Sequence, residues 1–306
     1  MQMVDELAEI FIQTKISTGE PIGHDVPITK AACLSQNDHK KALNFRAIFI
    51  SDIHLGTKDC KAVQLNSFLK HYSCEQLYLV GDIFDGWRMK SGIYWHKSFN
   101  RVIHRVLKLA KKGTPVYYIT GNHDEFLRKY ANSQFDNIYL CNRKIHVTRT
   151  GKKILVIHGD QYESVTRCTK LLKYVGDRGY DWLMSINRGC NYLRARYGYG
   201  YWSFAAFLRQ RLKRARQYIE DYECAVAHGA KRSGFDGVIC GHIHQAADKQ
   251  IEEIQYLNTG DWVESCTAVV EDFDGEFHLI RWFDDPKCHD FAKKEKYIRN
   301  ISATSN

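Results

Sequence analysis

Residues 47–56 read AIFISDIHLG, and this stretch decides the fold class. Its first four residues, Ala47 to Ile50, are apolar and predict a short buried strand. Asp52 and His54 follow directly, and both side chains are of types that bind metal ions in proteins. Ligands of open α/β sheets gather at the carboxyl ends of the strands. The stretch therefore predicts a buried strand that ends at a functional edge.

Four further apolar runs end in the same way along the chain. The strand candidates are residues 47–51, 77–80, 116–120, 154–158 and 237–240. Their carboxyl ends deliver Asp52, His54, Asp82, Asn122, His158, His242 and His244. Because parallel strands end at one edge of a sheet, we expect these groups to converge.

The segments between the strand candidates indicate the fold class. Apolar residues recur at helical spacing in residues 65–72 and again in residues 99–110. Short apolar strands separated by such helices predict an α/β arrangement with parallel strands. Residues 267–282 differ, because two apolar segments flank the turn signal Asp274-Gly275 and predict an antiparallel hairpin.

Composition sets limits on the class of protein. The chain has 306 residues, of which 44% are hydrophobic and 26% charged, as in an ordinary globular protein. No apolar run reaches the roughly 18 residues of a membrane span, and we see no secretory signal. Ten scattered cysteines without a C-x-x-C pair indicate thiols in a reducing compartment. The net charge of +9 favours an anionic partner.

We expect four segments. Residues 1–44 form a partly flexible extension, residues 45–160 and 230–285 form the core, and residues 286–306 form a tail. Residues 161–229 interrupt the alternation of strands and helices and carry twelve Lys and Arg against six Asp and Glu. We interpret them as a basic helical insertion.

The seven polar groups at the strand ends comprise three oxygen donors and four imidazoles. That is too many for one tetrahedral ion and suits two ions that share a carboxylate. Mixed N and O ligands favour Mn²⁺, Fe²⁺ or Zn²⁺, and of these we expect Mn²⁺. Two ions can position a nucleophile and stabilise a phosphoryl group. Nine further histidines are interpreted as ordinary core or surface residues: 24, 39, 71, 96, 104, 146, 228, 278 and 289.

The order D-x-H, G-D-x-x-D, G-N-H-D, H-G-D, G-H-x-H over residues 52–244 resembles the calcineurin-like metallophosphoesterase superfamily. The resemblance implies an α+β sandwich of two mixed β-sheets flanked by helices, here with a helical cap. It assigns one ion to Asp52, His54, Asp82 and His244, and the other to Asp82, Asn122, His158 and His242. His123 would be the catalytic residue, which protonates the leaving oxygen or stabilises the transition state. Asp85, Asp124 and Asp160 would orient neighbouring imidazoles, with turn capping as the alternative.

Residues 45–283 are also similar to UDP-2,3-diacylglucosamine diphosphatase-like proteins of lipid A biosynthesis. The similarity lies in SDIHLG (51–56), YLVGDIFDGW (78–87), NTGDWVESCTA (258–268) and the insertion. It implies hydrolysis of UDP-2,3-diacylglucosamine to UMP and the acylated sugar 1-phosphate, on the cytoplasmic face of the inner membrane as a peripheral protein. The best-studied branch carries Arg where this chain has His123, so the exact substrate stays open.

The insertion and two loops supply candidate substrate contacts. Trp202 and Phe207 lie in an aromatic stretch followed by the basic run 209–216, which suits acyl chains, a diphosphate and anionic headgroups. The alternatives are an internal core of the insertion and a solvated helix face. Trp87 and Arg88 could face the phosphates, and Asn258 and Asp261 could approach the metals; loop structure is the alternative for all four.

Two other functions compete with the lipid hydrolase. The same metals and the charge of +9 also suit a phosphodiesterase or nuclease, although the absence of a second basic domain disfavours nucleic acid. A metal-free interaction scaffold should lack several ligands, and all seven are present here.

Overall fold

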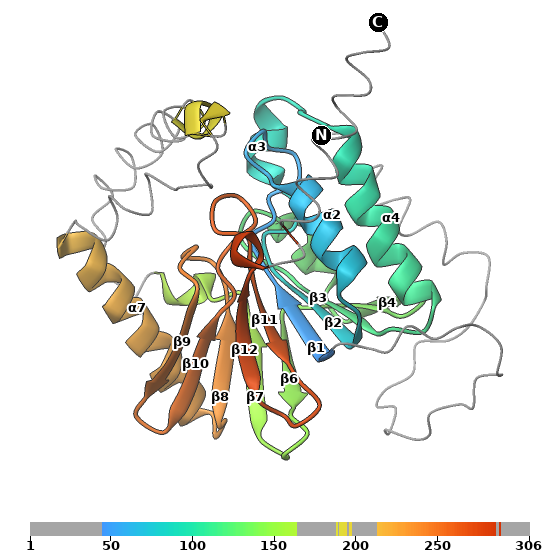
Figure 1. The fold of residues 1–306 in the computed structure, drawn as a ribbon. Helices are drawn as coiled ribbons and strands as arrows, with labels where there is room; N and C mark the ends of the chain where they lie inside the picture. The colour runs from blue at the N-terminus through green and yellow to red at the C-terminus, as the bar shows by residue number, and fades with distance from the viewer. Residues whose placement is uncertain are drawn as a thin grey trace, which may run out of the picture.

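The computed structural model describes residues 45–163, 188, 190–194, 196–197, 213–285 and 288. Two β-sheets pack face to face, and helices cover both outer faces (Figure 1). The expected sandwich of two mixed sheets flanked by helices is confirmed. Residues 1–44 and most of residues 164–212, including Trp202 and Phe207, lie outside the described residues.

The first sheet has seven strands in the order β12-β11-β1-β2-β3-β5-β4. Its strands are β1 (Phe45–Ile50), β2 (Cys74–Val80), β3 (Val116–Ile119), β4 (Ser133–Phe135), β5 (Ile138–Cys141), β11 (Thr267–Glu271) and β12 (Phe277–Arg281). Strands β1, β2, β3 and β5 are parallel to their neighbours in this series. Strands β11 and β12 form the expected antiparallel hairpin, and β11 pairs antiparallel with β1.

The second sheet has five strands in the order β6-β7-β8-β10-β9. Its strands are β6 (Arg143–Val147), β7 (Lys153–Ile157), β8 (Gly237–Cys240), β9 (Ala247–Ile251) and β10 (Ile254–Asn258). Strands β7, β8 and β10 run parallel, while β6 and β9 are antiparallel edge strands. The five strands expected from sequence are therefore divided between two sheets: three lie in the first and two in the second.

Three apolar layers hold the sandwich together. Between the sheets, Phe49, Val80 and Ile119 of the first pack against Val156 and Ile239 of the second. A second layer joins the outer face of the first sheet to α2 (Ala62–His71) and α4 (Lys97–Lys111). A third joins the second sheet to α7 (Lys213–Arg232). Burial of apolar area in these layers contributes roughly 25 cal/mol per Å².

Helix α7 changes the expected extent of the insertion. The boundary predicted at residue 229 falls inside this helix. Tyr222, Val226 and Ala230 of α7 are fully buried against the second sheet. The end of the basic helical range is therefore a layer of the core, because its apolar side chains recur at a spacing that fits the face of the sheet.

Short elements complete the described chain. They are α3 (Gly86–Ser91) and three 3₁₀ turns: η1 (Glu125–Tyr130), η2 (Asp160–Tyr162) and η3 (Trp282–Asp284). None of the helices in the described ranges combines the length and apolar character that a membrane span requires. The loops after β1, β2, β3, β7 and β8 carry the residues predicted to form the site.

Candidate metal centre

The site loops hold their polar residues in an uncommon backbone conformation. Nine non-glycine residues have positive φ in the described chain, and five of them are predicted metal ligands. These five are Asp52, His54, Asp82, His242 and His244, with φ between 50° and 71°. Left-handed backbone is uncommon outside glycine, and such strain gathers at functional sites. The loops are therefore shaped to aim these side chains.

Two motif glycines leave room for the carboxylates. A β-carbon on Gly121 would overlap the Asp82 carboxylate, and one on Gly241 would overlap Oδ2 of Asp52. The neighbouring backbone N–H groups then reach the same carboxylates. His123 N donates to Oδ1 of Asp82 at 2.8 Å, and His242 N donates to Oδ2 of Asp52 at 3.0 Å. Each aspartate thus has one oxygen fixed by the backbone and one directed elsewhere.

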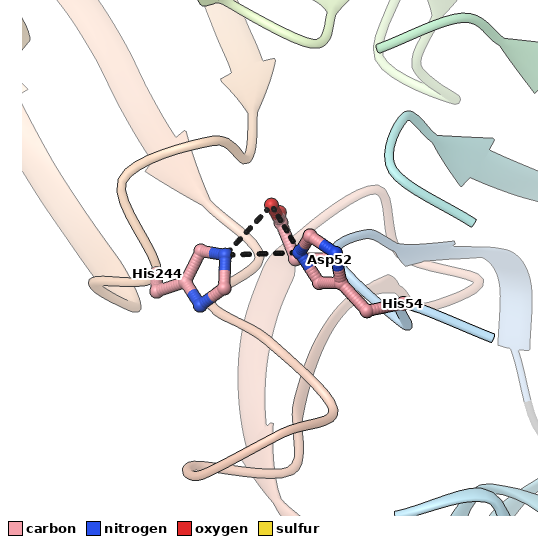
Figure 2. Close-up of side chains that lie close together, drawn as sticks. All are labelled: Asp52, His54 and His244. Carbon is pink, nitrogen blue, oxygen red and sulfur yellow. Dashed lines mark hydrogen bonds and ion pairs between the residues drawn. The ribbon is translucent and has the colours of Figure 1, made fainter. Parts of the chain in front are cut away.

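Asp52, His54 and His244 form the first group of the site (Figure 2). Oδ1 of Asp52 lies 3.2 Å from Nε2 of His244 and 3.9 Å from Nε2 of His54. The two Nε2 atoms are themselves 3.2 Å apart. Figure 2 shows the carboxylate and both rings directed toward one point.

Asp82 joins this group to a second one. Its Oδ2 lies 3.3 Å from Nε2 of His158 and 4.0 Å from Nε2 of His54. Ligand atoms of Asp82, His158 and His242 all lie within 4.8 Å of one another. Oδ1 of Asn122 lies 3.1 Å from Nε2 of His158. The structure thus brings all seven predicted ligands into two adjoining groups with Asp82 between them. Their role as ligands remains a prediction.

The hydrogen-bonding needs of these groups fit a cation. Oδ1 of Asp52 is buried and accepts no hydrogen bond from the described residues. Nδ1 of His158 donates to the Val80 carbonyl at 3.0 Å. In the neutral ring Nε2 is therefore an acceptor, and it faces two further acceptors, the oxygens of Asp82 and Asn122. Buried acceptors without donors are costly. A divalent cation satisfies all of them, so the residues present fit two divalent ions.

Electrostatic effects in the site are large. Burial alone would raise the pKa of Asp82, but the imidazoles of His158 and His54 hold that pKa well below its usual range. Burial alone would lower the pKa of His158, but the Asp82 carboxylate raises it to about 10. Burial, with the charge of His158, lowers the pKa of His242 to about 4. Perturbed groups that converge in this way are typical of functional sites.

His123 lies beside the two groups with its ring confined on three sides. The indole of Trp87 covers it at a centroid distance of 4.2 Å, and the His54 ring meets it edge-on at 4.7 Å. Nδ1 of His123 lies 3.1 Å from Oδ1 of Asp85, and its Nε2 lies 4.0 Å from Oδ2 of Asp82. The position suits proton transfer close to the shared carboxylate.

Asp85 contacts two imidazoles at once. Its Oδ2 is 3.1 Å from Nδ1 of His54, while its Oδ1 faces His123 and accepts from the Arg88 backbone N–H at 2.8 Å. Its pKa lies below its usual range, because the nearby imidazoles of His123 and His54 outweigh the opposing effect of burial. The arrangement suits the orienting role expected for Asp85, which remains a prediction.

The structure places Asp124 and Asp160 differently from Asp85. Asp124 accepts from Gly121 N, from Ile83 N at 2.9 Å and from the Tyr118 hydroxyl at 2.6 Å, so it holds loops together. Asp160 pairs with Arg128 at 2.6 Å. Neither carboxylate makes a hydrogen bond to an imidazole in the described chain. Their placement favours the turn-capping alternative.

The four loop candidates for substrate contact fall into an exposed pair and a buried pair. Trp87 and Arg88 are both exposed, and the Trp87 indole lies over the His123 ring. Asn258 is buried and donates to the Gly241 carbonyl at 2.8 Å. Asp261 is buried and accepts from the backbone N–H of Val263 at 2.8 Å. Asn258 is thus hydrogen-bonded to the loop after β8 and Asp261 to its own loop, and contact of either side chain with a substrate remains a prediction.

Sequence reasoning missed two side chains of the site. Oε2 of Glu163 lies 3.8 Å from Nε2 of His242, and the Ser51 hydroxyl donates to Oδ2 of Asp52. Ser51 belongs to the stretch quoted at the outset, and its position beside Asp52 is the only sequence signal for it. Glu163 stands four residues after Gly159, at the start of the segment interpreted as an insertion, and nothing in the sequence singles it out.

Comparison with known proteins gives an independent view of the chain. The sequence pattern of the calcineurin-like phosphoesterase family matches residues 45–246. The UDP-2,3-diacylglucosamine hydrolase of Aliivibrio fischeri (strain MJ11) is 27% identical over 234 residues, which cover 70% of this chain and 90% of that protein. A protein of the same name from Blochmanniella floridana is 35% identical over 118 residues, or 37% of this chain. That alignment spans 46% of the Blochmanniella protein, less than half its length.

A solved structure of an archaeal phosphodiesterase is also similar. It has 12% sequence identity and a TM-score of 0.36, and the match covers 77% of this chain and 98% of the archaeal one.

Proposed function

This chain belongs to the calcineurin-like phosphoesterase family, and from that premise we propose that it is a dinuclear-metal hydrolase of UDP-2,3-diacylglucosamine. The reaction cleaves the phosphoanhydride and releases UMP and 2,3-diacylglucosamine 1-phosphate. The family supports a metal-dependent phosphoester hydrolase. The substrate is our proposal, supported by the names of the similar proteins from Aliivibrio and Blochmanniella.

One observation carries the proposal. Asp82 lies between two groups of imidazoles and oxygens whose hydrogen-bonding needs two divalent cations would meet. Asp52, His54, Asp82 and His244 would hold one ion, and Asp82, Asn122, His158 and His242 the other. Divalent ions in such a pair polarise phosphoryl oxygens and lower the pKa of water. Mixed nitrogen and oxygen ligands suit Mn²⁺, Fe²⁺ or Zn²⁺, and we propose Mn²⁺ in this role.

The protein's own residues then have separate tasks. His123 delivers a proton to the oxygen of the leaving phosphate through Nε2, the ring nitrogen nearer Asp82. Asp85 holds Nδ1 of that ring, and Trp87 confines its face. Because Asp85 also contacts His54, one carboxylate sets the positions of a metal ligand and the proton donor together.

The acylated substrate also suggests a location. We propose a protein that works at the cytoplasmic face of the inner membrane, where a substrate with two acyl chains resides. The insertion within residues 161–229 would form the acyl-binding cap, with Trp202 and Phe207 in its groove. Replacing either with Asp should impair the acylated substrate far more than a small phosphodiester, and equal losses on both substrates would remove the groove from the proposal.

The test compares three substrates with Mn²⁺-loaded protein. UDP-2,3-diacylglucosamine, bis(4-nitrophenyl) phosphate and single-stranded DNA are supplied separately, and products are identified by mass spectrometry. We expect UMP and the acylated sugar 1-phosphate, with a kcat/KM that exceeds the value for the aryl diester. Preferred cleavage of DNA or of the aryl diester would instead identify a phosphodiesterase or nuclease.

A further inference from the structure

An exposed surface with both apolar and basic side chains adjoins the metal centre. Ile93 and Tyr94 are 47% and 38% exposed, and they follow α3 in the chain. Exposed basic residues lie near them in the chain, namely Lys90, Lys97 and Arg101, and the exposed Lys58 approaches Tyr94 from the loop after β1. We call these six residues the α3 patch. Two neighbouring large apolar side chains that are both exposed, with basic residues near them, make this surface a candidate for interaction with a partner.

The fold anchors the patch from beneath. Trp95 packs edge-on against the buried Phe99 at a centroid distance of 5.5 Å and stacks near Phe84 at 6.5 Å. The ring of Tyr94 contacts Phe99 at 6.0 Å. The loop between α3 and α4 is therefore fixed by one tryptophan, while Ile93 and Tyr94 are presented outward. The exposure of these two side chains follows from the architecture of the loop.

The charge of the patch has a single sign. Residues 86–101 contain four Lys and Arg and no Asp or Glu. Lys58, on the loop after β1, reaches the same place, because its Nζ lies 5.9 Å from the centroid of the Tyr94 ring. The surface thus combines an aliphatic side chain, an aromatic side chain and a basic surround. This combination suits an anionic interface in which part of the contact is apolar.

The patch is connected to the catalytic residues by a short path. Helix α3 begins directly after Asp85, whose carboxylate faces His54 and His123. The backbone N–H of Gly86 donates to the His123 carbonyl at 2.9 Å. A surface bound at the patch would therefore contact the segment that begins at Asp85 and Gly86, beside His123.

We propose that the α3 patch docks the protein onto an anionic lipid bilayer, with Ile93 and Tyr94 entering the headgroup region. This inference rests on the proposed function, because an acylated substrate is delivered from a bilayer. Tyrosine favours the membrane–water boundary, and basic residues are attracted to anionic lipids. A nucleic acid would leave Ile93 without an apolar partner. A second copy placed symmetrically would bring two basic patches together, which is repulsive.

The experiment measures co-sedimentation of the full chain with vesicles. Vesicles of phosphatidylcholine with phosphatidylglycerol are compared with phosphatidylcholine alone. Two double variants test the patch: Ile93→Ser with Tyr94→Ser, and Lys90→Gln with Lys97→Gln. Matched controls are Ile145→Ser, an exposed residue of β6, and Lys111→Gln with Lys112→Gln at the other end of α4.

We expect the wild type to bind the anionic vesicles and to be released by 0.5 M NaCl. The lysine pair should lower the partition coefficient about 25-fold, since each basic residue near such a surface contributes roughly fivefold. The Ile93 and Tyr94 pair should also weaken binding, while both controls bind as the wild type does. Turnover of soluble bis(4-nitrophenyl) phosphate should be unchanged in all variants, which shows that the fold and the metal centre are intact.

Equal vesicle binding by patch variants and controls would overturn the proposal, as would absence of binding by the wild type. Binding of single-stranded DNA through the same lysines, or a dimer that the Ile93 and Tyr94 pair dissociates, would replace the lipid with another partner. Vesicle binding without hydrolysis of UDP-2,3-diacylglucosamine would count against the proposed substrate and leave the docking surface standing.

Discussion

Two buried polar clusters lie at opposite ends of β1, and they differ in how well their hydrogen-bonding needs are met. The metal centre follows the carboxyl end of β1, after Ile50. The other cluster lies near its amino end and consists of Arg46, Tyr78, His146 and Glu271. We call it the interior cluster. Both clusters contain a carboxylate that is fully buried, Asp52 in one and Glu271 in the other.

Both carboxylate oxygens of Glu271 have hydrogen-bond partners. Its Oε1 accepts from Arg46 at 2.8 Å and from the backbone N–H of Arg149 at 2.9 Å. Its Oε2 accepts from Arg46 at 2.6 Å and lies 2.7 Å from Nε2 of His146. Nδ1 of that imidazole lies 2.9 Å from the Tyr78 hydroxyl. The interior cluster is complete within the protein.

In the metal centre, by contrast, some hydrogen-bonding groups have no partner among the described residues. Oδ1 of Asp52 accepts no hydrogen bond from the described residues, and Nε2 atoms of His54 and His244 face each other at 3.2 Å. Several of its residues also hold a left-handed backbone. The comparison teaches that buried charge alone does not mark a site. A site is marked by buried polar groups that converge without hydrogen-bond partners, because such groups are costly to bury unless a ligand binds them.

The largest expected effect is on catalysis. His123→Ala should keep both ions and lower kcat by about 10²–10⁴-fold, the usual size of a general-acid contribution. The ring lies beside the ligands without being one in our assignment. Metal content by mass spectrometry and steady-state kinetics measure the two effects separately. His104→Ala, an exposed histidine of α4, is the control. Loss of both ions in the His123 variant would contradict the role we assign.

Substitution in the interior cluster should lower the stability of the fold without changing the kinetics of the enzyme. Glu271→Ala leaves Arg46, His146 and the Arg149 N–H without their acceptor, and should lower the free energy of unfolding by about 3–5 kcal/mol. Urea unfolding measures this loss. The KM of the folded fraction should be unchanged. An altered KM would show that the two clusters are coupled and that the interior cluster does more than stabilise the fold.

Asp85→Asn tests whether Asp85 contributes both to metal binding and to catalysis in the metal centre. Because this carboxylate contacts both His54 and His123, the variant should weaken metal affinity and slow turnover, each by about 10–100-fold. Metal titration and kinetics at saturating Mn²⁺ separate the two losses. Full rescue of kcat by excess Mn²⁺ would mean that Asp85 acts only through His54 and not on His123.

The smallest effect is a pH dependence of stability. Burial would raise the pKa of Glu271, but the His146 imidazole and other donors lower it below its usual 4.5. A lowered folded-state pKa contributes stability above pH 4.5 that is lost as pH falls through the folded value. The wild type should therefore lose unfolding free energy below pH 4.5 more steeply than Glu271→Gln. Parallel slopes for both proteins would refute this.

Much of the fold was predictable from the chain. Strands β1, β2, β3, β7 and β8 are short apolar runs, and the hairpin of β11 and β12 carries its own turn signal. Strands β4, β5, β6, β9 and β10 are not among the predicted runs. β4 has only three residues, and β6 and β9 are mostly exposed, as in ADKQI of β9. The division of parallel strands between two sheets depends on contacts far apart in sequence, which local patterns do not contain.

The site shows the same limit. Its motif residues were predictable because aspartate, asparagine and histidine stand at strand ends. Glu163 and the dual contact of Asp85 depend on where loops meet, so the sequence could not place them. His146 was interpreted as an ordinary core residue, and its place in the interior cluster agrees with that interpretation.

The central claim is that Asp82 is shared by two cations, and metal stoichiometry tests it most directly. Wild-type protein and Asp82→Ala are stripped, reloaded with Mn²⁺, dialysed and assayed by inductively coupled plasma mass spectrometry. Asp274→Ala, an exposed aspartate in the turn between β11 and β12, serves as the control. The account predicts two ions per chain in the wild type and the control, and loss of both ions and of activity in Asp82→Ala. A single ion in the wild type, or two ions retained without Asp82, would contradict it.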